Sequence, residues 1–240
     1  MKLLVTMLAA LCCFTINADQ QKLTVGTNTD FAPFSFIQNG EITGFDIDVA
    51  KEAGRRMGCE LQFKDMPFDA LIPDIVMGNV DFAAAGFSYT DERAKRVDFT
   101  NNYLDEDPLV IISLKEPVAF DDLKGKSVVV VEGFTADILM SSVQGIELTR
   151  LPTQADAFMA LLSKRADVFV NAKSTVDNFI ASHPNIAVFQ QPIEGSGETC
   201  ALVVPKGKKE LRDRLQKALN EMEADGTMQT LKIKWKLAAP

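Results

Sequence analysis

Two short segments place polar and small residues directly after strongly apolar runs. Residues 26–31 (GTNTDF) follow the run that starts at Leu23, and residues 132–135 (EGFT) follow Ser127–Val131. In parallel α/β sheets a ligand binds beyond the carboxyl ends of the strands, where unpaired N–H groups of helix N-termini face the crevice. Helix N-termini favour anions. The two segments therefore predict a site for a small ligand that carries a carboxylate or a phosphate.

Residue patterns that support catalysis are missing from the sequence. It contains no Gly-x-Ser-x-Gly elbow, no Walker loop and no paired-cysteine motif. Residues 195–197 (GSG) resemble a nucleophile turn, but no strand-to-helix step surrounds them. His183 is the only histidine, which excludes a multi-histidine metal site, and its place before Pro184 is typical of a helix C-terminus. We therefore expect no catalytic residue, no metal ion and no cofactor.

The elements that would position the two segments occur twice in the same order. Strand, helix, strand, helix and strand are predicted over residues 23–27, 46–57, 60–64, 68–77 and 81–85, and again over 127–131, 135–142, 147–151, 154–163 and 167–171. Asp46 is placed to cap the first helix and Gly58 to end it. This order implies parallel strands joined by crossover helices, and so an α/β protein of two lobes.

Two irregular stretches separate the predicted lobes. Residues 101–108 (NNYLDEDP) precede an extended run over 109–114, and residues 190–198 (QQPIEGSGE) precede a strand over 200–205. A basic amphipathic helix over 208–223 and a final helical turn through Trp235 follow. Such a chain crosses between the lobes twice. We therefore predict lobe 1 from residues 19–108 plus 197–240, lobe 2 from residues 109–196, and a hinge of two strands.

The first residues have the layout of a secretory signal peptide. Lys2 precedes an apolar stretch over residues 3–16, and Ala18 is a small residue before a cut. The stretch is too short to span a bilayer. We place the signal peptide at residues 1–18 and expect a periplasmic or otherwise secreted protein. Lipid anchoring at Cys12 is an alternative, but the bulky Leu11 before it disfavours that, and the type of signal peptidase stays open.

Charge and composition exclude several classes of protein. The sequence has 25 Lys and Arg against 33 Asp and Glu, a net charge of −8, and so lacks the basic character of a nucleic-acid-binding protein. Its 47% apolar and 24% charged residues are typical of a globular fold. Beyond the signal peptide only Cys59 and Cys200 remain. Their spacing does not decide whether they pair, and two buried thiols are the simpler interpretation.

Six stretches form an ordered set of motifs. They are residues 26–36 (GTNTDFAPFSF), 40–50 (GEITGFDIDVA), 68–100, 121–135 (DDLKGKSVVVVEGFT), 164–170 (KRADVFV) and 224–235 (ADGTMQTLKIKW). The set resembles the polar amino-acid family (family 3) of periplasmic substrate-binding proteins, the receptors of ABC-type importers, over nearly all of the chain after the signal peptide. The resemblance implies the type II periplasmic-binding fold, in which two Rossmann-like lobes close on a ligand, and an inner-membrane permease as partner.

The resemblance also implies a clamp for a ligand carboxylate. In relatives an arginine after the third strand of lobe 1 holds the ligand α-carboxylate, and Arg93 is the matching residue. A planar guanidinium binds a carboxylate through two parallel hydrogen bonds. Without the resemblance, Arg93 would be one exposed charge in a run, and Thr135 a simple helix N-cap. The other matching positions supply hydroxyl and backbone groups: Gly86, Phe87 and Ser88 in lobe 1, and Gly133, Phe134 and Thr135 in lobe 2.

Three further positions match residues around the ligand side chain. Phe31 and Phe68 match two positions whose side chains enclose its aliphatic or planar part. Asn28 matches a position that reads the ligand side chain, and Asp30 lies close by.

One position departs from the family pattern. Relatives have an acid at the end of the third strand of lobe 2, where it pairs with the ligand α-ammonium, but this sequence has Ala172. Asn171 would point to the opposite side of the strand, and Lys173 has the wrong sign to bind an amine. Whether the ligand carries an α-amino group is therefore open. We expect that it does, and that another acid takes the missing role; the candidates are Asp30, Glu132 and Glu198.

The sequence thus predicts a binding protein rather than an enzyme. It would be a monomer that captures a small carboxylate-bearing solute, which we expect to be a polar amino acid, and presents it to a permease. Two alternatives stay open. One is a dehydratase of cyclohexadienyl acids on the same scaffold, which would need a proton donor deep between the lobes. The other is a ligand-sensing protein that has lost transport.

Overall fold

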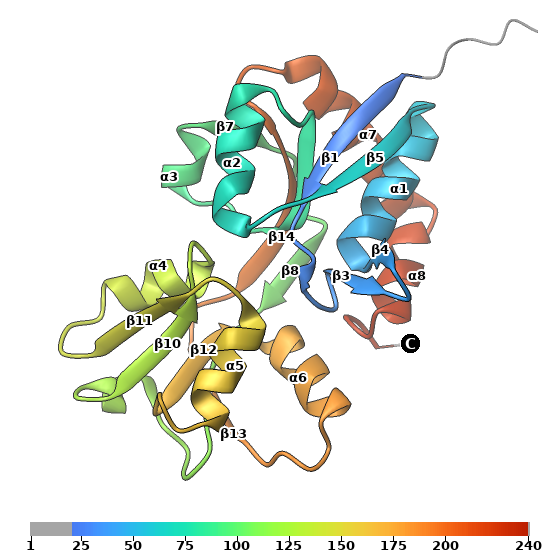
Figure 1. The fold of residues 1–240 in the computed structure, drawn as a ribbon. Coiled ribbons are helices and arrows are strands. Elements are labelled where there is room, and N and C mark those ends of the chain that lie inside the picture. The colour runs from blue at the N-terminus through green and yellow to red at the C-terminus, as the bar shows by residue number, and fades with distance from the viewer. Residues whose placement is uncertain (1–20, 240) are drawn as a thin grey trace, which may run out of the picture.

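The structure, a computed structural model, describes residues 21–239, which form two α/β lobes (Figure 1). The first lobe is built on a sheet of strand order β5-β1-β6-β14-β7, and β8 pairs with β14. The second lobe is built on a sheet of strand order β11-β10-β12-β9-β13. The predicted signal peptide lies outside the described residues.

Parallel strands form the centre of the first lobe. β1 (Lys22–Thr27) pairs in parallel with β5 (Glu60–Asp65) and β6 (Phe82–Phe87), while β14 (Glu198–Pro205) runs antiparallel to β6 and β7 (Val97–Phe99). The helices of this lobe are α1 (Phe45–Met57), α2 (Phe68–Met77), α3 (Asp91–Ala94), α7 (Lys209–Ala224) and α8 (Thr227–Lys234). A small sheet of β2 (Asp30–Phe31), β3 (Ser35–Gln38) and β4 (Glu41–Thr43) follows β1.

The second lobe repeats the parallel arrangement. β10 (Ser127–Val131) pairs in parallel with β11 (Glu147–Leu151) and β12 (Val168–Ala172), and β9 (Leu109–Ser113) runs antiparallel to β12 and β13 (Phe189–Pro192). A short 3₁₀ helix (Phe120–Leu123) precedes β10. The helices are α4 (Thr135–Ser141), α5 (Gln154–Leu162) and α6 (Lys173–Ser182).

Apolar strands are buried on both faces of each sheet, as parallel sheets require. In β10, Val129 and Val131 join the apolar cluster that includes α5, whereas Val128 and Val130 join the one that includes α4. The cluster containing Val129 extends into the first lobe, where it includes residues of α1 and α7. Cys59 and Cys200 are buried, free thiols.

Two chain segments link the lobes. β8 (Leu104–Asp107) leads out of the first lobe and pairs antiparallel with β14, which returns to it, so that Glu198 lies opposite Asp107. The division at residues 108/109 and 196/197 stays a prediction. Membership of the two sheets supports it, because β1 to β8 and β14 lie outside the second sheet and β9 to β13 form it.

Two local expectations were wrong. Asp46 does not cap α1: Gly44 is the N-cap, and Asp46 lies fully buried in the first turn. Only glycine fits at position 44, since its φ is +134° and an added Cβ would lie 2.1 Å from the carbonyl oxygen of Phe34. In addition, the stretch predicted to be irregular before β14 contains part of β13, which pairs with β9.

Candidate functional site

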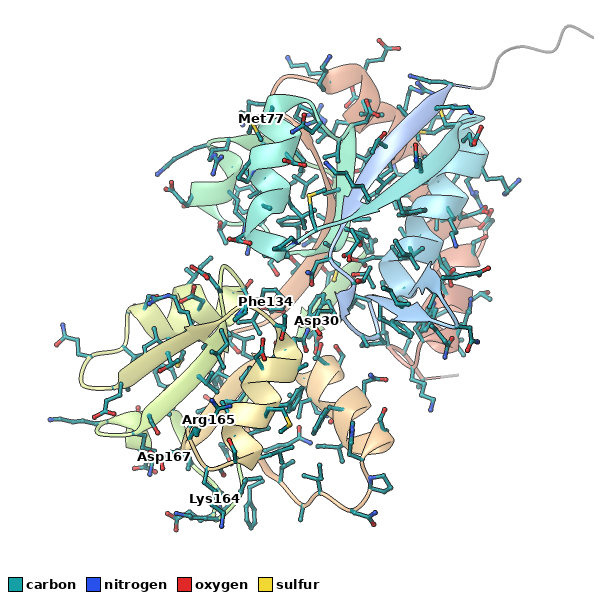
Figure 2. All side chains as sticks on the ribbon, in the orientation of Figure 1. Asp30, Met77, Phe134, Lys164, Arg165 and Asp167 are labelled. Atoms are coloured by element: carbon teal, nitrogen blue, oxygen red, sulfur yellow. The ribbon has the colours of Figure 1, made fainter. Side chains whose placement is uncertain are left out.

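The predicted site residues come from loops and strand ends at the junction of the two lobes. Lobe 1 contributes the segment after β1, the first residue of α2, the end of β6 and helix α3, and lobe 2 contributes the segment after β10 and the end of β12. Asp30 and Phe134 mark this junction in Figure 2, where they approach each other from opposite lobes. The structure therefore brings together the two segments that the sequence singled out.

Arg93 is buried at this junction and bonds to both lobes. The hydroxyl of Thr90, the N-cap of α3, accepts a hydrogen bond from the Arg93 backbone N–H. Nη1 of Arg93 donates to the carbonyl of Ser88 (2.8 Å) and Nη2 donates across the junction to the carbonyl of Gly133 (2.9 Å). The side chain is 7% exposed, so its interpretation as a surface charge is wrong. Burial lowers the pKa of Arg93 to about 10, which leaves it a cation at neutral pH.

Aromatic rings surround the Arg93 guanidinium. It lies 5.2 Å from the ring centre of Phe68 and 5.4 Å from that of Phe87, and these two rings stack at 4.6 Å. Such faces attract a cation, most strongly where water is excluded. Phe87 therefore serves the site by holding the arginine in place.

Phe134 contacts both rings that were predicted to enclose a ligand. Its centroid lies 5.2 Å from that of Phe31 and 4.8 Å from that of Phe68, with edge-to-face geometry in both pairs. Phe134 is 6% exposed. The lobes are thus closed on each other here, with a lobe 2 ring packed against the lobe 1 rings.

The end of strand β6 is held in place by a buried acid. Asp46 accepts hydrogen bonds from the backbone N–H of Gly86 and from the hydroxyl of Tyr103 (2.9 Å). Burial raises the pKa of Asp46 to about 7, although both hydrogen bonds oppose the rise. Gly86 has φ +64°, and an added Cβ would lie 2.2 Å from Cε1 of Phe31. The sequence did not reveal this role of Asp46, because its position before an apolar helical pattern was already accounted for by capping of α1.

Ser88 connects the clamp to the returning strand. Its hydroxyl donates to the carbonyl of Thr199 (2.9 Å) and accepts from the Thr199 N–H (3.2 Å). Thr135 is the first residue of α4, whose N-cap is Phe134, so the N-cap interpretation of Thr135 was wrong.

Glu198, next to Thr199, is a buried acid beside this group. Its pKa is raised to about 7 by burial first and by the nearby Asp107 second, while the Thr135 hydroxyl and Arg93 lower it. Glu198 therefore stands within electrostatic reach of both halves of the predicted clamp.

The two predicted site residues with polar side chains after β1 have different partners. The Asn28 amide donates to the carbonyl of Met66 (3.2 Å) within lobe 1. The Asp30 carboxylate accepts from the backbone N–H of Gln154 at the start of α5, and so joins the lobes. Burial raises the pKa of Asp30, although hydrogen bonds from Gln154 and Ala155 oppose the rise.

The end of β12 contributes amide groups and no acid. Ala172 is fully buried and pairs with Leu109. The Asn171 amide donates to Oε1 of Gln154 (3.1 Å), and Oδ1 of Asn171 accepts from the Ala172 N–H. The side chain of Lys173 pairs with Asp177. At the position where the sequence departs from the family pattern, the end of β12 therefore carries no charge.

A cavity of about 500 Å³ lies beside Asp30, between the β2–β3 hairpin and helices α5 and α6. The rings of Phe158 and Phe179, which stack at 3.6 Å, line it together with Gln154 and Thr175.

Within residues 21–239, no cluster of three or more His, Cys, Asp or Glu side chains could hold a metal ion. No helix in the same range combines the length and apolar character needed to cross a membrane.

Comparison with known proteins supplies the family. Residues 23–238 match the model of the bacterial extracellular solute-binding proteins, family 3. The chain belongs to this family. The predicted family and fold class are thereby confirmed.

The relatives of this family 3 protein are named after amino acids. A probable histidine-binding protein of Campylobacter jejuni is 31% identical over 90% of this chain and 85% of its own. The ABC transporter arginine-binding protein 1 of Escherichia coli is 30% identical over 95% and 96%. These relatives are named as binding proteins, not as enzymes.

Solved structures with a similar fold include proteins that are also named after an amino acid. An ancestral arginine-binding protein bound to arginine superposes with a TM-score of 0.84 at 36% identity, covering 89% of this chain and 97% of that one. A mutant of the arginine-binding protein from T. maritima also has a TM-score of 0.84 at 36% identity, with 90% and 96% covered. An ancestral arginine-binding protein bound to glutamine has a TM-score of 0.83 at 36% identity, with 89% and 97% covered.

Proposed function

We propose that this protein is the periplasmic receptor of an ABC-type importer and that it binds an amino acid whose α-carboxylate is held by Arg93. The carrying observation is a buried cation at the lobe junction whose hydrogen bonds go to two carbonyl groups, those of Ser88 and Gly133. Among the described residues it forms no ion pair. A carboxylate is a stronger acceptor for a guanidinium than a carbonyl is.

The ligand carboxylate takes the place of the Gly133 carbonyl on Arg93. For this exchange the lobes separate, the contacts of Phe134 with Phe31 and Phe68 are released, and the lobes close again around the ligand. Thr135, at the first turn of α4, then faces the bound carboxylate from lobe 2, where the helix N-terminus favours negative charge. Hinge closure of this kind completes a site from two half-sites.

L-arginine is the first amino acid to test. Two similar solved proteins are named arginine-binding, although an ancestral one was also bound to glutamine. In this chain Asp30 adjoins an aromatic-lined cavity, a surrounding suited to a cationic side chain.

Calorimetry of L-arginine binding to Arg93→Ala tests the clamp. Loss of one partner of a buried charge pair costs about 2–5 kcal/mol, so the affinity should fall by roughly 30-fold to several thousand-fold. Arg96→Ala is the matched control, because Arg96 lies in the same run and is exposed. Near-native affinity in Arg93→Ala would overturn the proposal.

We infer further that the protein binds without converting its ligand. The relatives are binding proteins by name, and the dehydratase alternative finds no support among them. Incubation with L-arginine and with arogenate should return both compounds unchanged, and turnover of either would overturn the inference.

A further inference from the structure

An α-ammonium group buried between the lobes needs an acidic partner. Without one, the desolvation of the charge costs several kcal/mol. The end of β12 cannot supply it, since Ala172 has no polar side chain and Asn171 bonds to Gln154 and to the Ala172 N–H. If the proposed function holds, the acid comes from another element.

Two of the three candidate acids are unsuited to this role. Glu132 is exposed to solvent. The Asp30 carboxylate is engaged by backbone N–H groups of the first turn of α5, at Gln154 and Ala155.

Glu198 combines burial with a position beside the clamp. It begins β14, and the next residue, Thr199, is bonded twice to the Ser88 hydroxyl, which fixes Glu198 close to the loop after β6. A hydrogen bond from the Thr135 hydroxyl and the charge of Arg93 both lower the pKa of its carboxyl group. Glu198 is 9% exposed and forms no ion pair within residues 21–239.

The charges around Glu198 favour a cation. Its cross-strand neighbour Asp107 is also acidic, and the Asp107 carboxylate is already bonded to the backbone N–H (3.0 Å) and hydroxyl (2.5 Å) of Ser174. Arg93 is a base whose charge lowers the pKa of Glu198. A ligand carboxylate bound to Arg93 would offset the positive charge that stabilises ionised Glu198. A second positive charge on the ligand would then stabilise the Glu198 carboxylate.

We propose that Glu198 receives the α-ammonium group of the bound amino acid, in place of the acid that relatives carry at the position of Ala172. The specificity for an amino acid over a plain carboxylic acid then resides on β14 of lobe 1 and not on β12 of lobe 2. This inference rests on the proposed function.

Calorimetry with two probes tests it: L-arginine, and guanidinovalerate, which is L-arginine without its α-amino group. The native protein should prefer L-arginine by at least about 30-fold. Glu198→Gln should lose most of that preference by weakening L-arginine binding, while guanidinovalerate binding changes by no more than a few-fold. Glu132→Gln, which removes an exposed acid, is the matched control and should keep the native preference.

Two more variants keep the test decisive. Glu198→Asp retains the charge and should retain part of the preference, and it serves if the glutamine variant does not fold. Ala172→Asp added to Glu198→Gln should restore the preference from the family's usual position. An unchanged preference in Glu198→Gln overturns this proposal and leaves the Arg93 clamp standing. If the native protein binds neither these probes nor any other amino acid, the proposed function fails and this inference fails with it.

Discussion

Glu198 carries a carboxyl group whose ionisation depends on its burial. Its folded pKa is about 7 against an ordinary value of 4.5, because burial and Asp107 disfavour the charged form more than Arg93 and Thr135 favour it. Between these two pH values the folded protein holds a proton that the unfolded chain has released. The free energy of unfolding therefore falls as the pH rises through this window.

We expect Glu198→Gln to remove this part of the pH dependence. Relative to the native protein, the variant should gain on the order of 3 kcal/mol in unfolding free energy between about pH 4.5 and pH 8. Urea denaturation of both proteins at the two pH values measures it. Asp46, whose pKa is also about 7, contributes equally to both and cancels. A difference that does not change with pH would contradict the assignment.

Gly86 is a second residue on which the geometry of the site depends, because the space beside it admits no side chain. Gly86→Ala places a methyl group 2.2 Å from Cε1 of Phe31, in a backbone conformation that alanine disfavours. We expect a loss of about 2–5 kcal/mol in unfolding free energy, the sum of left-handed strain and overpacking. Gly40→Ala is the control, since Gly40 also has positive φ (+81°) but no atom within 4 Å of an added Cβ. Its loss should be about 1–2 kcal/mol, and equal losses would remove the role of Phe31.

Helices and strands with strong local patterns could be predicted from the sequence, and those held by distant partners could not. The bounds of α2 and β10 match their predictions, because a closing glycine ends α2 and a continuous apolar run forms β10. The hairpin β2–β4 and strand β13 were missed. These strands are short and their residues are largely polar. β13 forms because it pairs with β9.

The same distinction holds for the site. Arg93 was found through the motif around it, whereas the position of Glu198 follows from the pairing of β8 with β14, which joins residues far apart in the chain.

Helix α5 carries a contact between the lobes at its first turn. Its own N-cap, Thr153, accepts from the Asp156 N–H (3.0 Å), while Asp30 of lobe 1 accepts from the Gln154 N–H. An anion at a helix N-terminus is favoured by the helix dipole as well as by the hydrogen bond.

Asp30→Asn should therefore weaken the closed state without unfolding either lobe. A loss of about 0.5–2 kcal/mol would reduce the affinity for L-arginine by roughly 2- to 30-fold. Thr153→Ala removes the cap inside lobe 2 and should lower the melting temperature with little effect on affinity. Calorimetry and thermal unfolding of both variants separate the two contacts. The reverse pattern would show that Asp30 serves the stability of one lobe.

At the scale of the whole molecule, one apolar cluster extends through both lobes. It includes Phe31 of lobe 1 and Phe134 of lobe 2, whose rings meet at 5.2 Å, and it continues into the helices on each side. Together with the bonds from Arg93 to Gly133 and from Asp30 to Gln154, these rings hold the lobes closed on each other. In the proposed binding step the ring contacts and the bond of Arg93 to Gly133 are released, whereas the bond of Asp30 to Gln154 forms again when the lobes close on the ligand.

Phe134→Ala should shift the unliganded protein toward an open form. The substitution removes the ring that contacts both Phe31 and Phe68, so closure without ligand loses buried apolar area, which is worth about 25 cal/mol per Å². Small-angle scattering should then give the variant a larger radius of gyration than the native protein without ligand, and saturating L-arginine should reduce it. Phe189→Ala, which truncates a ring that is 42% exposed on β13, is the control and should leave the profile unchanged. If Phe134→Ala is as compact as the native protein in the absence of ligand, the ring contacts do not hold the lobes together, and the closed state depends on the bonds of Arg93 and Asp30 alone.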